Sequence, residues 1–152
     1  MQLKIGDKAP DFSGKDQNGK TIQLSDFSGK KIAIYFYPKD NTPGCTVQAC
    51  NLRDNDVALT KAGIQIIGVS ADSSASHTKF IEKFSLPFPL IADEDKTIIQ
   101  EFGVWGPKKF MGKEYDGIHR TTFVIDENHT IVGIIEKPKT KEHAEEILAL
   151  LK

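Results

Sequence analysis

Two stretches of the chain are almost continuously apolar, residues 31–37 (KIAIYFY) and residues 64–70 (IQIIGVS). Short runs rich in β-branched and aromatic residues are typical of strands that are covered on both faces. Between them, apolar residues recur at roughly helical spacing from about Thr46, and Gly63 supplies the stop. The residues expected on one side of that helix are Val47, Leu52, Val57 and Leu59. The pattern therefore predicts a strand–helix–strand unit.

Further helices follow from the same spacing. One is expected near residues 76–84, where the residues at helical spacing are His77, Phe80, Ile81 and Phe84. A short helix over residues 93–102 has Asp93 as its cap, because a carboxylate can accept hydrogen bonds from the first free N–H groups. A closing amphipathic helix is expected to begin at Thr140, and its inward residues are Ile147, Leu148 and Leu151.

Paired strands complete the pattern. Residues 11–14 and 21–24 are expected to form a hairpin around Asn18-Gly19, a dipeptide that suits the positive φ angles of a tight type I′ turn. Residues 103–119 are punctuated by glycine and predict a loop or an irregular hairpin. Residues 120–126 and 130–136 are expected to pair around the turn at 127–129.

The order of these elements defines a fold class. Two strands are followed by β-α-β-α, then by a short helix, then by β-β-α. A parallel βαβ half joined to an antiparallel ββα half is the thioredoxin-type arrangement. We therefore expect an α/β protein with a thioredoxin-like fold, in which helices flank a mixed central sheet and a β-hairpin lies at the N-terminus. No repeat or linker interrupts the pattern, so residues 1–152 are expected to form a single domain.

Composition excludes several functional classes. The 152 residues include 20 Lys and Arg against 21 Asp and Glu, a net charge of -1. A nucleic-acid-binding protein usually carries a basic surplus. No segment approaches the ~18 apolar residues of a membrane span, and the N-terminus has no apolar run resembling a signal peptide. We therefore expect no nucleic acid or membrane as a partner, and a cytoplasmic location.

The two cysteines, Cys45 and Cys50, indicate chemistry. They are too few for a disulfide-stapled secreted scaffold, and in a reducing compartment a close pair is more often catalytic or metal-binding than structural. A zinc site takes about four ligands. None of the four histidines lies close to the pair in the sequence, so we expect no metal.

Cys45 is expected at the start of a helix, directly after the loop-forming residues 42–44 (TPG). The first turn of a helix has unpaired N–H groups and the positive end of the dipole, which favour thiolate over thiol. The alternative is an inert buried cysteine, since free Cys also packs as a small hydrophobe. The loop-forming neighbours favour the reactive thiol, because loops usually lie near solvent.

The spacing of the cysteines separates this chain from thioredoxin-like disulfide exchangers, which use C-x-x-C. Five residues of an ideal helix advance ~7.5 Å and ~500°, which places the two Cα atoms about 8.7 Å apart. A disulfide requires about 4.4–6.8 Å. If the pair oxidises to a disulfide, the first turns of the helix must therefore come apart.

Two blocks of the sequence carry a family resemblance. Residues 38–45 (PKDNTPGC) match the P-x-x-x-T-x-x-C signature of peroxiredoxins. Residues 42–50 (TPGCTVQAC), with LRD at 52–54, resemble the bacterioferritin comigratory (Q-type) subgroup. A second block agrees, with FGVWG at 102–106, YDGIHR at 115–120 and FVID at 123–126. The similarity extends from Lys8 nearly to the C-terminus.

This resemblance implies an antioxidant enzyme that reduces hydrogen peroxide and organic hydroperoxides through a cysteine, with no cofactor such as haem, flavin or metal. Cys45 matches the peroxidatic cysteine, whose thiolate becomes sulfenic acid. Cys50 matches the resolving cysteine, which condenses with that sulfenic acid to form a disulfide. Thioredoxin, or a similar dithiol protein, would then reduce the disulfide. The subgroup also implies a monomer.

Peroxide reduction needs more than a thiolate, because charge moves onto the leaving oxygen and must be met by aimed donors. If the resemblance holds, the donors are the Thr42 hydroxyl, backbone N–H groups near Cys45 and the Arg120 guanidinium. Pro38 would shape and dry the pocket. The only other arginine, Arg53, is followed closely by acidic residues and is expected to form a structural ion pair.

Two other functions remain open on these residues. A general disulfide oxidoreductase of the same fold would catalyse insulin reduction, whereas a peroxidase would consume peroxide with thioredoxin. A non-enzymatic redox sensor or holdase would signal through the oxidation state of Cys45 and Cys50 without fast turnover. The motif in its strand–loop–helix context favours the peroxidase.

Overall fold

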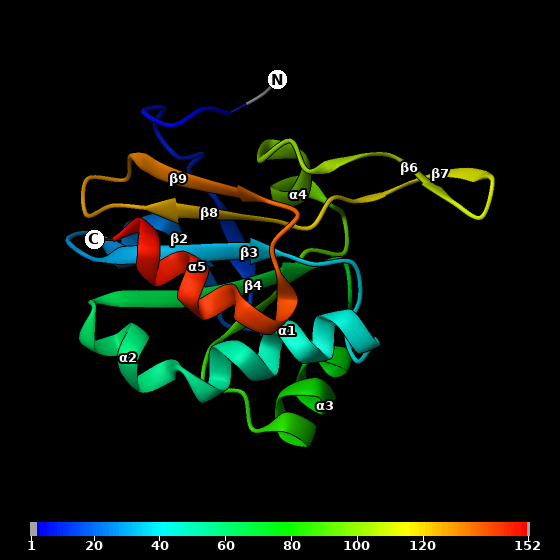
Figure 1. The fold of residues 1–152 in the computed structure, drawn as a ribbon, viewed down its shortest axis with the longest axis horizontal. Helices are drawn as coiled ribbons and strands as arrows, with labels where there is room; N and C mark the ends of the chain where they lie inside the picture. The colour runs from blue at the N-terminus through cyan, green and yellow to red at the C-terminus, as the bar shows by residue number, and fades with distance from the viewer. Residues whose placement is uncertain (1–2, 152) are drawn as a thin grey trace.

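A computed structural model describes residues 3–151 of the protein. Its centre is a five-stranded sheet in the order β5-β4-β3-β8-β9 (Figure 1). The strands are β3 (Lys31–Phe36), β4 (Ile64–Ser70), β5 (Leu90–Ala92), β8 (Thr121–Ile125) and β9 (Ile131–Glu136). β3, β4 and β5 are parallel, while β8 runs antiparallel to β3 and β9 antiparallel to β8. This mixed sheet confirms the predicted thioredoxin-like α/β fold.

Helices cover both faces of the sheet. The longer ones are α1 (Pro43–Asp54), α2 (Asp56–Lys61), α3 (Ser74–Phe84) and α5 (His143–Leu150). They contribute buried residues to a single core, which also holds Ala33 and Tyr35 of β3. The short α4 (Thr97–Glu101) packs on the opposite face, with Ile32 and Ile34 of β3. Side chains of a strand alternate between faces, so the apolar run of β3 fills both cores.

The N-terminal hairpin is present, but its turn differs from the prediction. β1 (Ser13–Lys15) pairs with β2 (Thr21–Gln23), and the four-residue 3-10 helix Leu24–Phe27 follows. Gly19 has the positive φ of 78° that was expected, but Asn18 does not share it, so the turn is not type I′. The Asp16 carboxylate closes the longer loop by accepting hydrogen bonds from the N–H groups of Asn18 and Lys20.

The helix after β3 is broken at Asn55, which separates α1 from α2. The Asn55 side chain donates to the carbonyl of Asn51, and such side-chain bonds compete with the helical pattern. The prediction that Val47 and Val57 face inward is wrong, because both are exposed, at 38% and 70%. Leu52 and Leu59 are fully buried as expected.

Two elements were missed or underestimated. β5 was not predicted, because its three residues follow the Pro87-Phe88-Pro89 segment and become a strand only by pairing with β4. Residues 103–119 contain a regular antiparallel hairpin, β6 (Trp105–Phe110) with β7 (Lys113–Ile118). This hairpin extends away from the central sheet (Figure 1).

The starts of α4 and α5 are capped differently from what the sequence predicted. The predicted helix start at Asp93 is wrong, because α4 begins at Thr97 and its N-cap residue is Lys96. The Asp93 carboxylate still accepts the N–H groups of Ile98 and Ile99, from a position before the helix. Thr140 does not cap α5; it begins a three-residue 3-10 helix, Thr140–Glu142, and makes no cap bond. Asn51 of α1 does so instead, since its Oδ1 accepts the N–H of Ala144 at 2.8 Å. α5 is thereby fastened to α1.

Candidate active site

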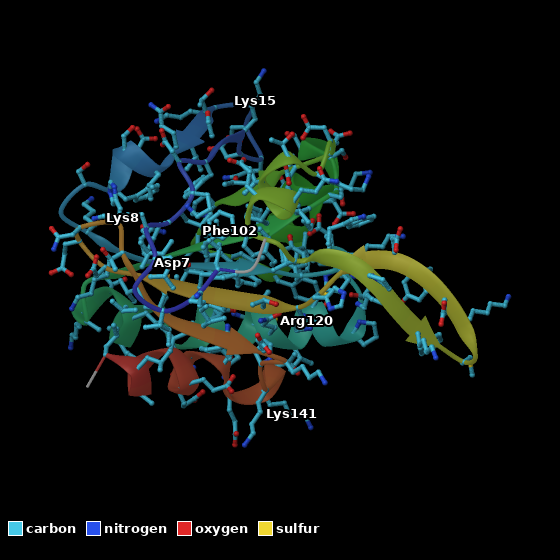
Figure 2. All side chains as sticks on the ribbon, turned by 90° about the horizontal axis from the view of Figure 1, so that it is seen from above. Asp7, Lys8, Lys15, Phe102, Arg120 and Lys141 are labelled. Atoms are coloured by element: carbon cyan, nitrogen blue, oxygen red, sulfur yellow. The ribbon has the colours of Figure 1, made fainter. Side chains whose placement is uncertain are left out.

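The fold brings together the C-terminal end of β3, the start of α1 and Arg120. β3 ends at Phe36, and the chain then passes through a loop into α1. β8 runs antiparallel to β3 and begins at Thr121, directly opposite Phe36. Arg120 precedes β8, so it lies at the edge where α1 starts, near the base of the β6–β7 hairpin (Figure 2).

Cys45 lies in the first turn of α1 and is 2% exposed. Arg120 Nη2 donates to its Sγ at 3.3 Å. The thiol is therefore next to a permanent positive charge and close to the helix N-terminus, and both stabilise a thiolate. The structure thus joins two of the residues singled out from the sequence, although they are 75 positions apart.

Gln48 is a third member of this cluster that sequence reasoning missed. Its Oε1 accepts from Arg120 Nη1 at 2.6 Å, and the side chain is fully buried. The amide cannot be turned round, since its NH2 group would then face the guanidinium donors. Gln48 follows Cys45 by three positions and so shares its helix face. The signal available in the sequence was a polar residue on that face, one turn after the cysteine.

Thr42 and Pro38 lie in the loop between β3 and α1 and are both partly buried. Thr42 directly precedes α1, and its carbonyl accepts the N–H of Thr46 at 2.8 Å. Its hydroxyl donates to the carbonyl of Lys39 at 2.9 Å and does not cap the helix. The loop therefore places Thr42 at the helix start, with its hydroxyl engaged by the loop itself.

Cys50 lies on the same uninterrupted helix as Cys45 and is partly exposed. Both cysteines are free thiols. On a regular helix their Cα atoms are about 8.7 Å apart, beyond the ~6.8 Å limit of a disulfide. The helical arrangement is therefore one that a disulfide between them would disrupt.

Buried ionisable groups nearby have shifted pKa values. Burial raises the pKa of Tyr35 well above its usual value, and the neighbouring Cys45 adds to the rise. Burial lowers the pKa of Lys108, and the positive charge of Arg120 lowers it further. Tyr35 therefore stays neutral beneath α1, and its buried hydroxyl has no hydrogen-bond partner among residues 3–151.

The second arginine, the groove beside Arg120 and the other titratable cluster lie apart from Cys45. Arg53 pairs with Asp54 at 2.9 Å and donates to the carbonyl of Phe84, as expected of a structural arginine. Trp105 and His119 line a groove of about 690 Å³ that reaches Arg120. Among residues 3–151, the group of side chains close enough to share a metal ion is Asp40, Asp72 and His77, and it contains neither cysteine.

A thiol held against an arginine at the start of a helix, on a thioredoxin-like sheet, defines a cysteine-based redox protein. Comparison with known proteins narrows this class. The profile of the AhpC/TSA family matches residues 5–134. Peroxiredoxin Bcp of Escherichia coli K12 is 50% identical over 150 residues, which cover 99% of this chain and 96% of that protein.

Solved structures agree. A cysteine-to-serine mutant of Xylella fastidiosa PrxQ superposes with a TM-score of 0.93 at 32% identity, covering 99% of this chain and 96% of that one. The Xanthomonas campestris bacterioferritin comigratory protein, described for its alkyl peroxide reduction activity, gives a TM-score of 0.86 at 36% identity and covers 92% and 89%.

The chain belongs to the peroxiredoxin family, in the bacterioferritin comigratory or Q-type subgroup. It is therefore a thiol peroxidase that reduces hydroperoxides. Its two cysteines are consistent with intramolecular resolution. No helix within residues 3–151 combines the length and apolar character needed to cross a membrane.

Proposed function

We propose that Cys45 is the peroxidatic cysteine. Its thiolate attacks the terminal oxygen of ROOH, a sulfur–oxygen bond forms, and the O–O bond breaks. Cys45 becomes sulfenic acid, and the alkoxide leaves and takes up a proton to give ROH. The observation that supports this assignment is the 3.3 Å hydrogen bond from Arg120 to a buried thiol in the first turn of α1.

Arg120 and Thr42 serve as the donors that meet the charge developing on the leaving oxygen. Arg120 is held by Gln48, so its fork of donors is oriented before the peroxide arrives. The Thr42 hydroxyl must leave the carbonyl of Lys39 to act on a peroxide. Pro38 precedes these residues in the same loop and limits the entry of water.

Cys50 resolves the sulfenic acid. Its thiol sulfur bonds to the Cys45 sulfur, and the sulfenic oxygen leaves as water. A dithiol protein such as thioredoxin then reduces the disulfide by exchange. Both cysteines lie within α1, so this step requires the start of the helix to unwind.

The natural setting follows from the same chemistry. Two free thiols that must be re-reduced in each cycle suit a reducing compartment such as the cytoplasm. We infer that residues 1–152 act as one domain, and as a monomer because the Q-type subgroup resemblance suggests one. The partners are a hydroperoxide and thioredoxin, with no metal or organic cofactor.

A coupled assay tests this function. Oxidation of NADPH through thioredoxin reductase and thioredoxin should depend on added peroxide, with hydrogen peroxide and alkyl hydroperoxides compared side by side. The Cys45→Ser variant is the control, because a hydroxyl is nearly isosteric but is not a nucleophile here. Residual turnover of Cys45→Ser above a few per cent would assign the chemistry to another group. Insulin reduction without peroxide turnover would favour the disulfide oxidoreductase.

A further inference from the structure

The loop that carries Thr42 has a backbone conformation that needs support. Asn41, directly before Thr42, has a φ of 58°, in the left-handed region that costs a non-glycine residue free energy. Within residues 3–151, its side chain takes part in a single long hydrogen bond, which Oδ1 accepts from Lys83 Nζ at 3.4 Å. The support must therefore come from neighbouring residues of the loop.

Asp40 supplies that support from inside the protein. Its side chain is 3% exposed, and its carboxylate accepts hydrogen bonds from the Tyr37 hydroxyl and from the Ser76 hydroxyl, the latter at 2.8 Å. The same carboxylate lies 2.6 Å from His77 Nδ1. Its backbone N–H donates to the Asp72 carboxylate at 2.8 Å. Both carboxylate oxygens of Asp40 and its backbone N–H thus take part in hydrogen bonds.

The proton positions around His77 show why this contact is strong. His77 is fully buried, and its Nε2 lies 2.9 Å from the carbonyl oxygen of Ile91. A carbonyl only accepts, so Nε2 carries a proton. Nδ1 faces a carboxylate, so a second proton must lie between Nδ1 and Asp40. The pair is therefore joined by a short hydrogen bond, and both nitrogens of the imidazole have partners.

We propose that Asp40 and His77 are positioning residues that hold the active-site loop, and we call the pair the Asp40–His77 clamp. Its partners outside the loop, Ser76, Asp72 and Ile91, belong to α3, to the segment after β4 and to β5. None belongs to α1, so the clamp stays closed when α1 unwinds. On reduction, α1 refolds from a start at Thr42 that has not moved. The clamp acts on the reaction through Thr42 and so rests on the function proposed above.

The experiment compares two reactions of Cys45 in a Cys50→Ser background, where Cys45 is the only cysteine. Peroxide attack uses the donors near Thr42, whereas alkylation by iodoacetamide uses only the thiolate and its access. For Asp40→Asn, we expect the ratio of the peroxide rate to the alkylation rate to fall about 10- to 100-fold, since small misplacements of reacting groups cost that much. A loss of global stability leaves this ratio unchanged as long as the variant remains folded, and circular dichroism at the assay temperature checks that condition.

Matched variants keep the test decisive. Asp93→Asn alters a carboxylate of similar burial, at 4% exposed, that bonds only α4 and its neighbours, and it should keep the parent ratio. Ser76→Ala removes one donor to Asp40 and should lower the ratio more mildly, even if Asp40→Asn folds poorly. If Asp40→Asn and Ser76→Ala both keep the ratio of peroxide rate to alkylation rate of the Cys50→Ser protein, the clamp proposal is wrong.

Thr42→Val in the Cys50→Ser background distinguishes a failure of the clamp from a failure of the proposed role of the Thr42 hydroxyl. If Thr42→Val and Asp40→Asn both lower the ratio, the clamp acts through Thr42 as proposed. If only Asp40→Asn does so, the hydroxyl has no part in the proposed function, and the clamp acts through the N–H groups at the start of α1.

Discussion

The reactive cluster consists of three side chains whose roles depend on one another. Cys45 provides the sulfur, Arg120 the positive charge, and Gln48 the oxygen that orients the guanidinium. Arg120 contributes two different N–H groups to these two partners, so its plane is fixed before substrate binds. Such preorganised donors are worth more than the same charge on a mobile side chain.

Replacing the donors should slow peroxide attack without abolishing it. We expect Arg120→Ala and Thr42→Val each to lower the rate constant for oxidation of Cys45 by about 10²–10³-fold, the usual loss for one electrostatic donor. Arg120→Lys should recover little, because an ammonium cannot contact both Cys45 and Gln48 as a fork does. If stopped-flow traces show a wild-type rate for either variant, the replaced residue is not one of the donors.

Gln48 should matter through Arg120. Gln48→Ala leaves one guanidinium N–H without its partner, and a hydrogen bond to a charged group is worth about 1.5–3 kcal/mol. We expect the peroxide rate constant to fall by about 10- to 100-fold. Gln100→Ala, on the exposed side of α4, is the matched control. Equal rates for the two variants would mean that Arg120 needs no orienting partner.

At the scale of elements, α1 carries the redox cycle. In the reduced protein it is continuous from Pro43 to Asp54 and contains both cysteines. The disulfide requires the first turns to open, which costs hydrogen bonds and the burial of Cys45 and Ala49. Val47 is already 38% exposed and adds less to that cost. Opening would present the disulfide to its reductant.

Amide hydrogen exchange tests this opening. On oxidation, exchange should become faster within residues 45–52 and hardly change in β4, which the disulfide does not touch. Reduction should restore the protection. Equal protection of α1 in the two redox states would contradict the mechanism, and would mean that the disulfide forms without loss of the helix.

The anchorage of α5 should make stability depend on pH. Burial lowers the pKa of His143, which contacts Thr122 through Nε2 at 2.7 Å. Below the unfolded value of about 6.5, the unfolded chain binds a proton that the folded protein resists. The stability that neutral His143 provides is therefore present above pH ~6.5 and is lost as the pH falls below it.

Urea unfolding midpoints at about pH 7.5 and pH 5.5 measure this effect. The wild type should lose more stability between the two than His143→Gln does. His119→Gln replaces an exposed histidine and should behave as the wild type. An identical pH response of His143→Gln and wild type would show that His143 is not held neutral in the fold.

At the scale of the whole molecule, the fold was predictable wherever local pattern and tertiary role agree. The apolar run of β3 predicted its own burial because every residue from Ile32 to Phe36 is covered. β5 was not predictable, since three residues have no period of their own and depend on β4. Val57 misled because the helix is broken at Asn55, whereas Val47 misled because five residues of a helix turn by ~500°, so Val47 does not share the face of Leu52.

The residues of the site likewise divide into those that the sequence predicted and those that it did not. Cys45 and Arg120 were found because motifs mark them, and the antiparallel pairing of β3 with β8 explains their meeting. Gln48 was missed because its partner is 72 positions away and nothing local marks it. The Asp40–His77 contact spans 37 positions and belongs to the same class. Long-range polar pairing is thus the part of this site that single-sequence reasoning does not reach.

The central claim is that Cys45 takes the oxygen and Cys50 releases it as water. Mass spectrometry of peptides after one equivalent of hydrogen peroxide tests it most directly. The wild type should contain a Cys45–Cys50 disulfide, and Cys45→Ser should remain unmodified. Cys50→Ser should be oxidised to sulfenic acid at Cys45, and a second equivalent of peroxide should take it on to sulfinic acid. Oxidation of Cys50 in the Cys45→Ser variant at the wild-type rate, or a wild type with no Cys45–Cys50 bridge, would contradict the account.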